Sequence, residues 1–118
     1  MKNFLAVYIG TPEALKKSGW ESLSDASRQE KTEAGIKGWH SWMEANRSSI
    51  VDTGSPLGKT KSTSKQGVSD IKNSLSGYTI VRADSHEAAA RLFENHPHFM
   101  LFPGDSVEIM ECLPIPGM

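Results

Sequence analysis

The chain has 118 residues, with 13 basic and 14 acidic side chains and a net charge of −1. A chain of this length predicts one domain, and its near-neutral charge excludes a general nucleic-acid binder and a polybasic membrane-surface protein. Hydrophobic residues make up 37% and the mean hydropathy is −0.41, so we expect a modest core unless a second copy shares it. Cys112 is the only cysteine, which excludes an internal disulfide and a cysteine-based zinc site and favours a reducing, cytoplasmic location.

The first predicted element is a strand at residues 4–9, which is β-branched and aromatic and ends before Gly10-Thr11-Pro12. Both faces of this strand are apolar, so we expect it at the centre of a sheet. The run is too short for a signal-peptide core or a membrane span. Residues 10–24 predict a connection with one helical turn at 13–17.

A long helix is predicted over residues 25–47, capped by Ser24 or Asp25. Its apolar residues recur at i, i+3 and i+7 and form one face directed at the core: Ile36, Trp39 and Met43. Gly35 and Gly38 each cost about 1 kcal/mol inside a helix. They indicate either the close approach of a neighbouring element or a local weakness or bend.

Residues 52–76 are poor in aliphatic side chains, and thirteen of them are Ser, Thr, Gly or Pro. We predict a strand around residues 49–55, followed by an exposed hairpin or flap. Lysines alternate with hydroxyl residues between Lys59 and Lys65. That pattern is typical of an exposed edge strand, with a phosphate-binding patch as the alternative.

A second strand is predicted at residues 77–83, with period-2 alternation. Asp84 is then expected to cap a helix, with Glu87 completing a capping box, and Pro97 to end it. The last predicted strand covers residues 106–113.

This order of elements predicts an α+β fold, a ferredoxin-like βαββαβ protomer with an antiparallel sheet and an extra hairpin. Residues 1–118 form a single predicted domain, with 52–76 as a polar flap and 114–118 as a tail. Helices on one face of the sheet leave the other face open. Because the first strand is apolar on both faces, we expect a second copy to cover the open one, as a homodimer through the sheet faces.

Several segments in this order resemble the YCII-related (DGPF-type) proteins. They are Asp52–Gly58 (DTGSPLG), residues 75–88 (LSGYTIVRADSHEA), His96-Pro97 and residues 106–114 (SVEIMECLP). The resemblance implies a dimeric α+β barrel, in which two ferredoxin-like protomers pair sheet against sheet. It also implies enzymatic work for the short members, in which a first-helix histidine meets an aspartate that precedes a proline; some relatives are dehydrochlorinases. In this chain His40 is the nearest first-helix histidine, and His96-Pro97 stands where the family has aspartate-proline.

The candidate site residues divide into a catalytic group, His40, Asp52 and His96, and a substrate-binding group, Trp39, Trp42 and His98. His40 suits a general base near neutral pH, or else a surface histidine that pairs with Glu44. Asp52 would orient a histidine or stabilise a turn. Trp39 and Trp42 would form an apolar wall or pack in the core.

His96 and His98 bracket Pro97 and would border a ligand cleft, or else cap a helix C-terminus and lie in a loop. A helix C-terminus favours protonated His96. With no third ligand at a suitable spacing, no metal is expected.

The first functional hypothesis is a cofactor-free small-molecule enzyme that carries out proton transfer, as isomerisation or elimination, in a cleft near the dimer interface. The alternative is a non-catalytic metabolite-binding or interaction module. A monooxygenase of the barrel type comes last, on fold analogy alone.

Overall fold

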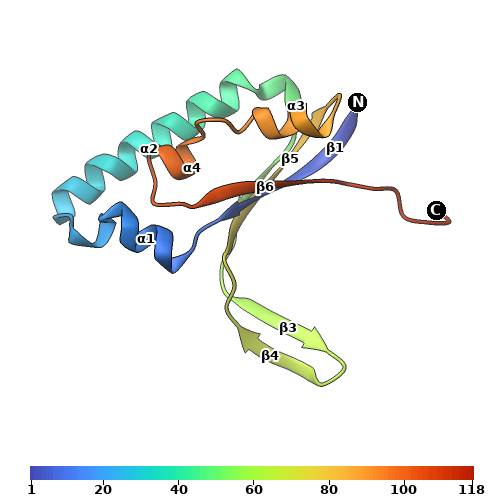
Figure 1. The fold of residues 1–118 in the computed structure, drawn as a ribbon, viewed down its shortest axis with the longest axis horizontal. Coiled ribbons are helices and arrows are strands. Elements are labelled where there is room, and N and C mark those ends of the chain that lie inside the picture. Colours follow the sequence, from blue (N-terminus) through green and yellow to red (C-terminus); the bar gives the residue numbers. More distant parts are fainter.

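The computed structural model describes all 118 residues. A four-stranded antiparallel sheet has the order β2-β5-β1-β6, and β3 and β4 form a separate two-stranded hairpin (Figure 1). The strands are β1 Lys2–Ile9, β2 Ile50–Pro56, β3 Thr60–Ser64, β4 Gly67–Ile71, β5 Leu75–Ala83 and β6 Ser106–Glu111. The α-helices are α1 Pro12–Ser18, α2 Asp25–Ala45, α3 His86–Arg91 and α4 Pro97–Met100, and short 3₁₀ turns cover Trp20–Ser22 and Arg47–Ser49.

The sequence β1-α2-β2-β5-α3-β6 has the predicted βαββαβ order, and its strand order is that of a ferredoxin-like sheet. The α+β class and the ferredoxin-like protomer are confirmed. β1 pairs with β5 on one side and β6 on the other, so its predicted central place is also confirmed. The predicted hairpin within 52–76 is the β3–β4 pair.

The core lies between the sheet and the helices. Alternate side chains of β1 and β5 point into it and meet two residues that follow β5: the buried cluster is Phe4, Ala6, Tyr8, Val81, Ala83, Ala89 and Phe93. Eight hydrophobic residues of the whole chain are buried. The core is therefore as small as the composition predicted.

Helix α2 begins at the expected cap, where the Ser24 hydroxyl accepts the backbone N–H of Ser27. Its glycines face the loop that follows α4. A Cβ on Gly35 would overlap the ring of Phe102, and one on Gly38 would overlap Leu101. The close-approach explanation of these glycines is thus the correct one.

The prediction of one helix from Asp84 to Pro97 is wrong. The cap is Ser85, whose hydroxyl accepts the N–H of Ala88, and α3 ends at Arg91. Asn95 has φ of 58° and redirects the chain. Pro97 begins the separate helix α4, because a first-turn residue needs no N–H.

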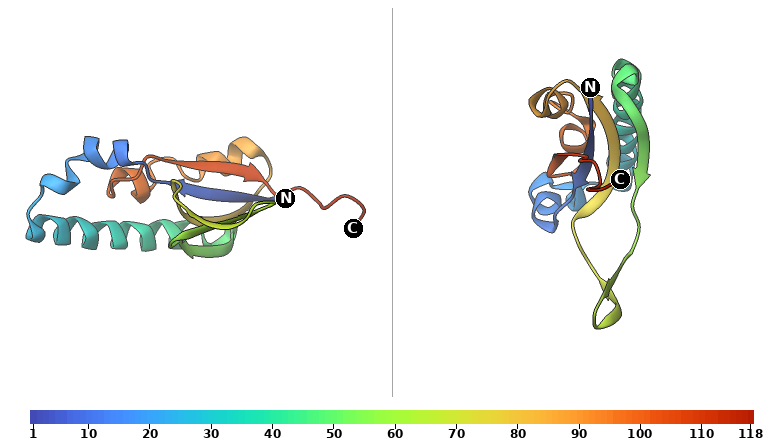
Figure 2. Two further views of the ribbon diagram at one scale, coloured as in Figure 1. Left: turned by 90° about the horizontal axis from the view of Figure 1, so that it is seen from below. Right: turned by 90° about the vertical axis from the view of Figure 1, so that its right-hand side faces the viewer.

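The sheet face opposite the helices is not covered. Strand register places on it Leu5, Val7, Tyr78, Ile80 and Met110, and Met110 is 44% exposed. The hairpin projects well away from the body (Figure 2), and the C-terminal tail extends beyond β6 (Figure 1). None of the helices is long and apolar enough to cross a membrane.

The contact between Gly35 and Phe102 makes a testable prediction. On an open helix surface, Gly→Ala would stabilise by about 1 kcal/mol. Here Gly35→Ala is expected to destabilise by about 1–3 kcal/mol, because the added methyl group must displace the Phe102 ring. Urea unfolding followed by circular dichroism measures the change.

The matched control is Lys37→Ala, an exposed position two residues further along α2, expected to change stability by less than about 0.5 kcal/mol. A Gly35→Ala protein that is more stable than wild type would contradict the close packing.

Candidate functional site

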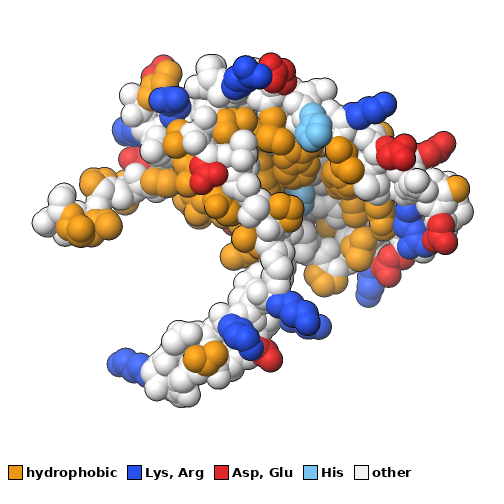
Figure 3. Space-filling view, turned by 180° about the vertical axis from the view of Figure 1, so that it is seen from behind, with side chains coloured by type: hydrophobic (Ala, Val, Ile, Leu, Met, Phe, Trp, Pro, Cys, Tyr) orange, Lys and Arg blue, Asp and Glu red, His pale blue; other side chains and the backbone are white.

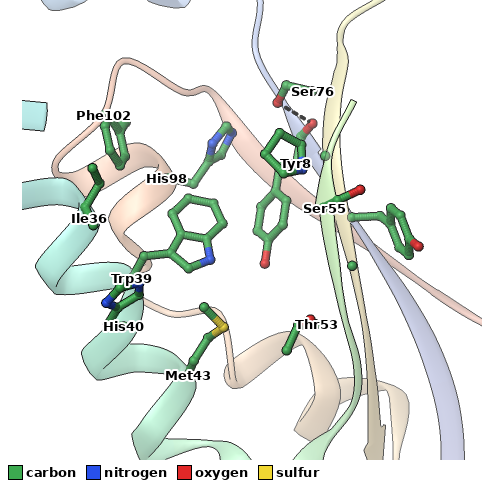
Figure 4. A pocket seen from close by; sticks show the side chains of 14 residues that line it. Tyr8, Ile36, Trp39, His40, Met43, Thr53, Ser55, Ser76, His98 and Phe102 are labelled. Carbon is green, nitrogen blue, oxygen red and sulfur yellow. Dashed lines mark hydrogen bonds between the residues drawn. The ribbon is translucent and has the colours of Figure 1, made fainter. Parts of the chain in front are cut away.

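A cavity of about 530 Å³ lies between α2 and the sheet (Figure 4). Its lining combines aromatic and aliphatic side chains with hydroxyl and imidazole groups, and includes no Lys, Arg, Asp or Glu. The lining residues are Tyr8, Ile36, Trp39, His40, Met43, Thr53, Gly54, Ser55, Pro56, Ser76, Gly77, Tyr78, His98 and Phe102. A site of this composition is suited to a small, largely apolar molecule that is uncharged or weakly ionised.

The helix wall of the cavity is the apolar face of α2. Ile36, Trp39 and Met43, which the periodicity assigned to the core, all line the cavity, and Ile36 is 48% exposed. The Trp39 indole meets Tyr8 edge-on, with 4.9 Å between the ring centroids. This apolar face points to the interior of the protein, as a core face does. The space beside it is the cavity, which no other side chains fill.

The strand wall is an irregular part of β2. The β2–β5 register shifts twice between Ile50 and Ser55, and Gly54 has φ of 68°, a conformation that favours glycine. Asp52 stabilises this turn, since its Oδ1 accepts the N–H of Gly54 at 2.8 Å. The Asp52 carboxylate is exposed and is not part of the lining.

His98 lies at the inner end of the cavity, near Tyr8 and Trp39 (Figure 4). Its Nε2 is 2.7 Å from the carbonyl oxygen of Ile9. A carbonyl only accepts, so Nε2 carries the proton and a neutral ring has an unprotonated Nδ1. Burial lowers the pKa of His98, against the opposing effects of the Ile9 carbonyl, the Asp105 carboxylate and the Ser106 backbone. His98 is therefore a neutral imidazole with one defined tautomer at pH 7.

His96 is completely buried among aromatic rings and positions His98 from behind. Its ring centroid lies 4.6 Å from both Trp39 and Trp42, and its Nδ1 accepts the backbone N–H of His98 at 3.0 Å. The Nε2 atom has no hydrogen-bond partner. Burial, assisted by repulsion from His98, lowers the pKa of His96 to about 4.

Two predictions about His96 are corrected by this arrangement. It caps the N-terminus of α4 and not the C-terminus of the preceding helix. It is also neutral at pH 7, because desolvation disfavours the imidazolium and no carboxylate or helix C-terminus compensates.

Tyr8 contributes its ring to the cavity while its hydroxyl is engaged. Thr79 Oγ1 donates to the Thr53 carbonyl at 3.0 Å. Since a threonine hydroxyl has one proton, the 2.7 Å contact between Tyr8 and Thr79 has Tyr8 as donor. Burial raises the pKa of Tyr8 to about 12, so the phenol stays protonated.

His40 and Trp42 occupy different surroundings. His40 is exposed at the rim of the cavity, and Glu44 pairs with Arg47 at 2.8 Å and not with His40. Trp42 is outside the lining; its Nε1 donates to the Leu92 carbonyl at 2.8 Å, and its ring packs on Phe93. Of the six predicted residues, the cavity brings together Trp39, His40 and His98.

The lining residues that were not predicted as site residues include three aromatic ones, Tyr8, Tyr78 and Phe102. Tyr8 and Tyr78 lie in strands whose alternation shows only that they face opposite sides of the sheet. Phe102 belongs to an apolar loop whose position the sequence does not predict. In the structure its ring lies against Gly35 of α2. No group of three His, Cys, Asp or Glu side chains could hold a metal ion.

No protein-family model matches the chain, and no curated protein matches it. A solved structure resembles it, 5-chloro-2-hydroxyhydroquinone dehydrochlorinase (TftG) from Burkholderia phenoliruptrix AC1100 in complex with 2,5-dihydroxybenzoquinone. The two chains are 17% identical, and the match covers 92% of this chain and 90% of that one with a TM-score of 0.50. At this identity the likeness supports the fold.

The surroundings of His96 predict a pH-dependent stability. Its pKa is about 4 in the folded protein and about 6.5 in an unfolded chain, so between these values the unfolded state binds more protons. Stability is therefore complete above pH 6.5 and falls as the pH is lowered toward 4. The loss by pH 4.5 is expected to be about 2–3 kcal/mol, measured by urea unfolding.

His96→Asn is the comparison, because asparagine keeps an N-cap acceptor but does not titrate. It should be less stable at pH 7.5 and show a smaller loss between pH 7.5 and 4.5 than wild type. Equal losses in both proteins would show that His96 does not carry the pH dependence.

Proposed function

We propose that this chain is a cofactor-free small-molecule enzyme that transfers a proton during an isomerisation or elimination in the cavity between α2 and the sheet. One observation supports this most strongly. The neutral imidazole of His98 is held in one tautomer by Ile9, with Nδ1 unprotonated, at the wall of an aromatic cavity without formal charges. An unprotonated imidazole nitrogen at such a wall is a general base at neutral pH.

In this proposal His98 is the base, in place of His40, and His96 is a positioning residue. Nδ1 of His98 takes a proton from a carbon atom of the ligand. In an elimination the electrons of that C–H bond form the new double bond and the leaving group departs with its bonding electrons, whereas in an isomerisation the proton is returned to another atom of the ligand. His40, at the rim, is less suited because no group orients its ring. Trp39 and Tyr8 would hold a flat ligand by ring contacts.

The ligand class proposed is a small ring compound with hydroxyl or carbonyl groups. The cavity offers aromatic faces from Tyr8, Trp39 and Phe102, and a hydroxyl group from Thr53. The dehydrochlorinase of similar fold acts on a chlorinated hydroxyhydroquinone, which makes chlorinated and unchlorinated hydroquinones the first compounds to assay. The resemblance to YCII-related proteins agrees with this choice.

A metabolite-binding module is the second candidate, and one observation favours it. No two titratable side chains of the lining, Tyr8, His40, Tyr78 and His98, are hydrogen-bonded to each other. A binding protein needs no such pair, whereas many proton-transfer enzymes orient their base with a second titratable group. Here the backbone carbonyl of Ile9 orients His98 instead.

Catalysis and binding are separated by His98→Gln. The glutamine amide can still donate to the Ile9 carbonyl but supplies no base, so turnover of a hydroquinone substrate should fall at least about 100-fold while its affinity changes little. Chloride release measures elimination, and uptake of deuterium from D₂O into the ligand, seen by NMR, measures isomerisation. Activity of the wild type should decline only below pH 6.5, because the base must be unprotonated and its pKa is lowered.

His40→Gln is the matched control at the rim, expected to retain turnover. Loss of turnover in His40→Gln with retention in His98→Gln would reverse the assignment of the base. Binding with no chemistry in the wild-type protein would favour the metabolite-binding module.

We also propose that the protein is a homodimer joined through the open sheet faces, in the manner of a dimeric α+β barrel. The uncovered face carries Leu5, Val7, Ile80 and Met110 at its centre. An apolar sheet face of this kind is normally covered in a soluble protein.

Light scattering should therefore give twice the monomer mass of 12.9 kDa. Ile80→Lys, in the middle of the face, should shift the protein toward monomer because it buries an unpaired charge in the interface. Ala90→Lys, at an exposed position on α3, should remain dimeric. A wild-type monomer at micromolar concentration would contradict the proposal.

A further inference from the structure

The hairpin and its two connections, residues 57–74, are called the arm below. β3 and β4 pair only with each other and form a sheet apart from the main one. Figure 2 shows the arm extending from the body, supported only at its base. An isolated two-stranded hairpin is at best marginally stable in water, so this one needs a surface to pack on.

The arm has one uncharged face and one charged face. Register places Thr60, Ser62, Ser64, Ser69 and Ile71 on the first, and Lys61, Thr63, Val68 and Asp70 on the second. On the charged face, Lys61 Nζ lies 2.6 Å from Asp70 Oδ1. The uncharged face carries Ile71, which is 45% exposed, and is the face that can be buried without desolvating a charge.

The charge of the arm is opposite to that of the body. The arm contains four lysines and one aspartate, net +3, whereas the whole chain has a net charge of −1, so the remaining residues carry −4. Figure 3 shows these basic side chains along the arm. Such an arm is attracted to the body of another copy of the same chain.

The position of the arm points to the same partner. In Figure 1 the arm bends toward the side of the sheet that the helices leave open, and the C-terminal tail extends on that side as well. A second copy on the open face would therefore lie between the arm and the tail. Hydrophobic side chains are exposed on the body beside the hollow next to the arm (Figure 3).

The base of the arm is also a wall of the cavity. Residues 53–56 and 76–78 line the cavity and lead directly into the arm, and the backbone N–H of Leu57 donates to the Ser76 carbonyl at 3.0 Å where they converge. That wall contains the register shifts of β2. Holding the arm in place would hold this part of the cavity in place.

We propose that the arm clasps a second copy of this chain through its uncharged face, and that this contact stabilises the strand wall of the cavity. The inference rests on the proposed homodimer and adds to it a specific contact outside the sheet faces. It links association of the protein with the order of its site.

The test compares Ile71→Asp on the uncharged face with Val68→Asp on the charged face; Val68 is the more exposed of the two, at 67% against 45%. Neither substitution touches the core, so both proteins should fold. Sedimentation velocity over a dilution series should show a dimer dissociation constant about tenfold higher for Ile71→Asp, and within about threefold of wild type for Val68→Asp. Equal dissociation constants in a dimeric protein would overturn the clasp and leave the homodimer standing. A wild-type monomer would overturn both.

Two further measurements test which face of the arm contacts the second copy and whether this contact stabilises the cavity wall. In a Cys112→Ser background, a photo-crosslinker on Ser62→Cys should join two chains more efficiently than one on Thr63→Cys, because these neighbours face opposite ways. Hydrogen exchange should be faster in Ile71→Asp than in Val68→Asp at the backbone amides of Ser55, Leu57, Gly77 and Tyr78. Equal crosslinking yields would overturn the assigned face, and equal exchange rates would overturn the coupling to the cavity.

Discussion

The hydrogen bond between Nε2 of His98 and the carbonyl oxygen of Ile9 joins parts of the chain that are 89 residues apart in sequence. It ties α4 to the end of the central strand β1 and places the proton of the neutral His98 ring on Nε2. Behind it, His96 accepts the His98 backbone N–H, and Gly104 leaves room for the His98 ring, which a Cβ there would overlap. Together these groups fix the position of the His98 side chain at the inner end of the cavity. Both hydrogen bonds are compatible with neutral histidines, and burial keeps both rings neutral by lowering their pKa values.

Burial also explains why the cavity as a whole has no formal charge. Tyr8 is kept protonated by desolvation, which outweighs the opposite effect of its hydrogen bond with Thr79 on the pKa, and the lining includes no formal charge. In such surroundings a charge that develops on a ligand is poorly screened. A base in this site must also be unprotonated at neutral pH, and the lowered pKa of His98 meets that requirement. A substrate that gains charge during reaction would rely on the Thr53 hydroxyl for stabilisation.

Sequence reasoning succeeded where one short-range pattern dictated the result. The alternation in β1 and β5, together with the Gly and Pro residues between the elements, predicted the ferredoxin-like order. Of the two explanations left open for Gly35 and Gly38, the structure supports the close neighbour. Sequence reasoning failed at His96, because a proline after an amphipathic run can end one helix or begin another. Here α3 ends at Arg91, Asn95 has a positive φ, and Pro97 begins α4. The site was predicted in part for a related reason. Periodicity places Trp39 and Met43 on an apolar face, but whether that face meets packed atoms or an open cavity depends on distant segments such as Phe102.

The small hydrophobic core links the order of the cavity to the proposed association of two copies. With eight buried hydrophobic residues, the protomer has little core to hold the strand wall of the cavity rigid. That wall is the part of the sheet with shifted register, and it continues into an arm that touches no other strand. An edge strand with shifted register and an isolated hairpin provide little rigidity of their own. A second copy that covers the open face and bears on the arm would supply this rigidity, and ligand binding in the cavity would in turn favour the associated state.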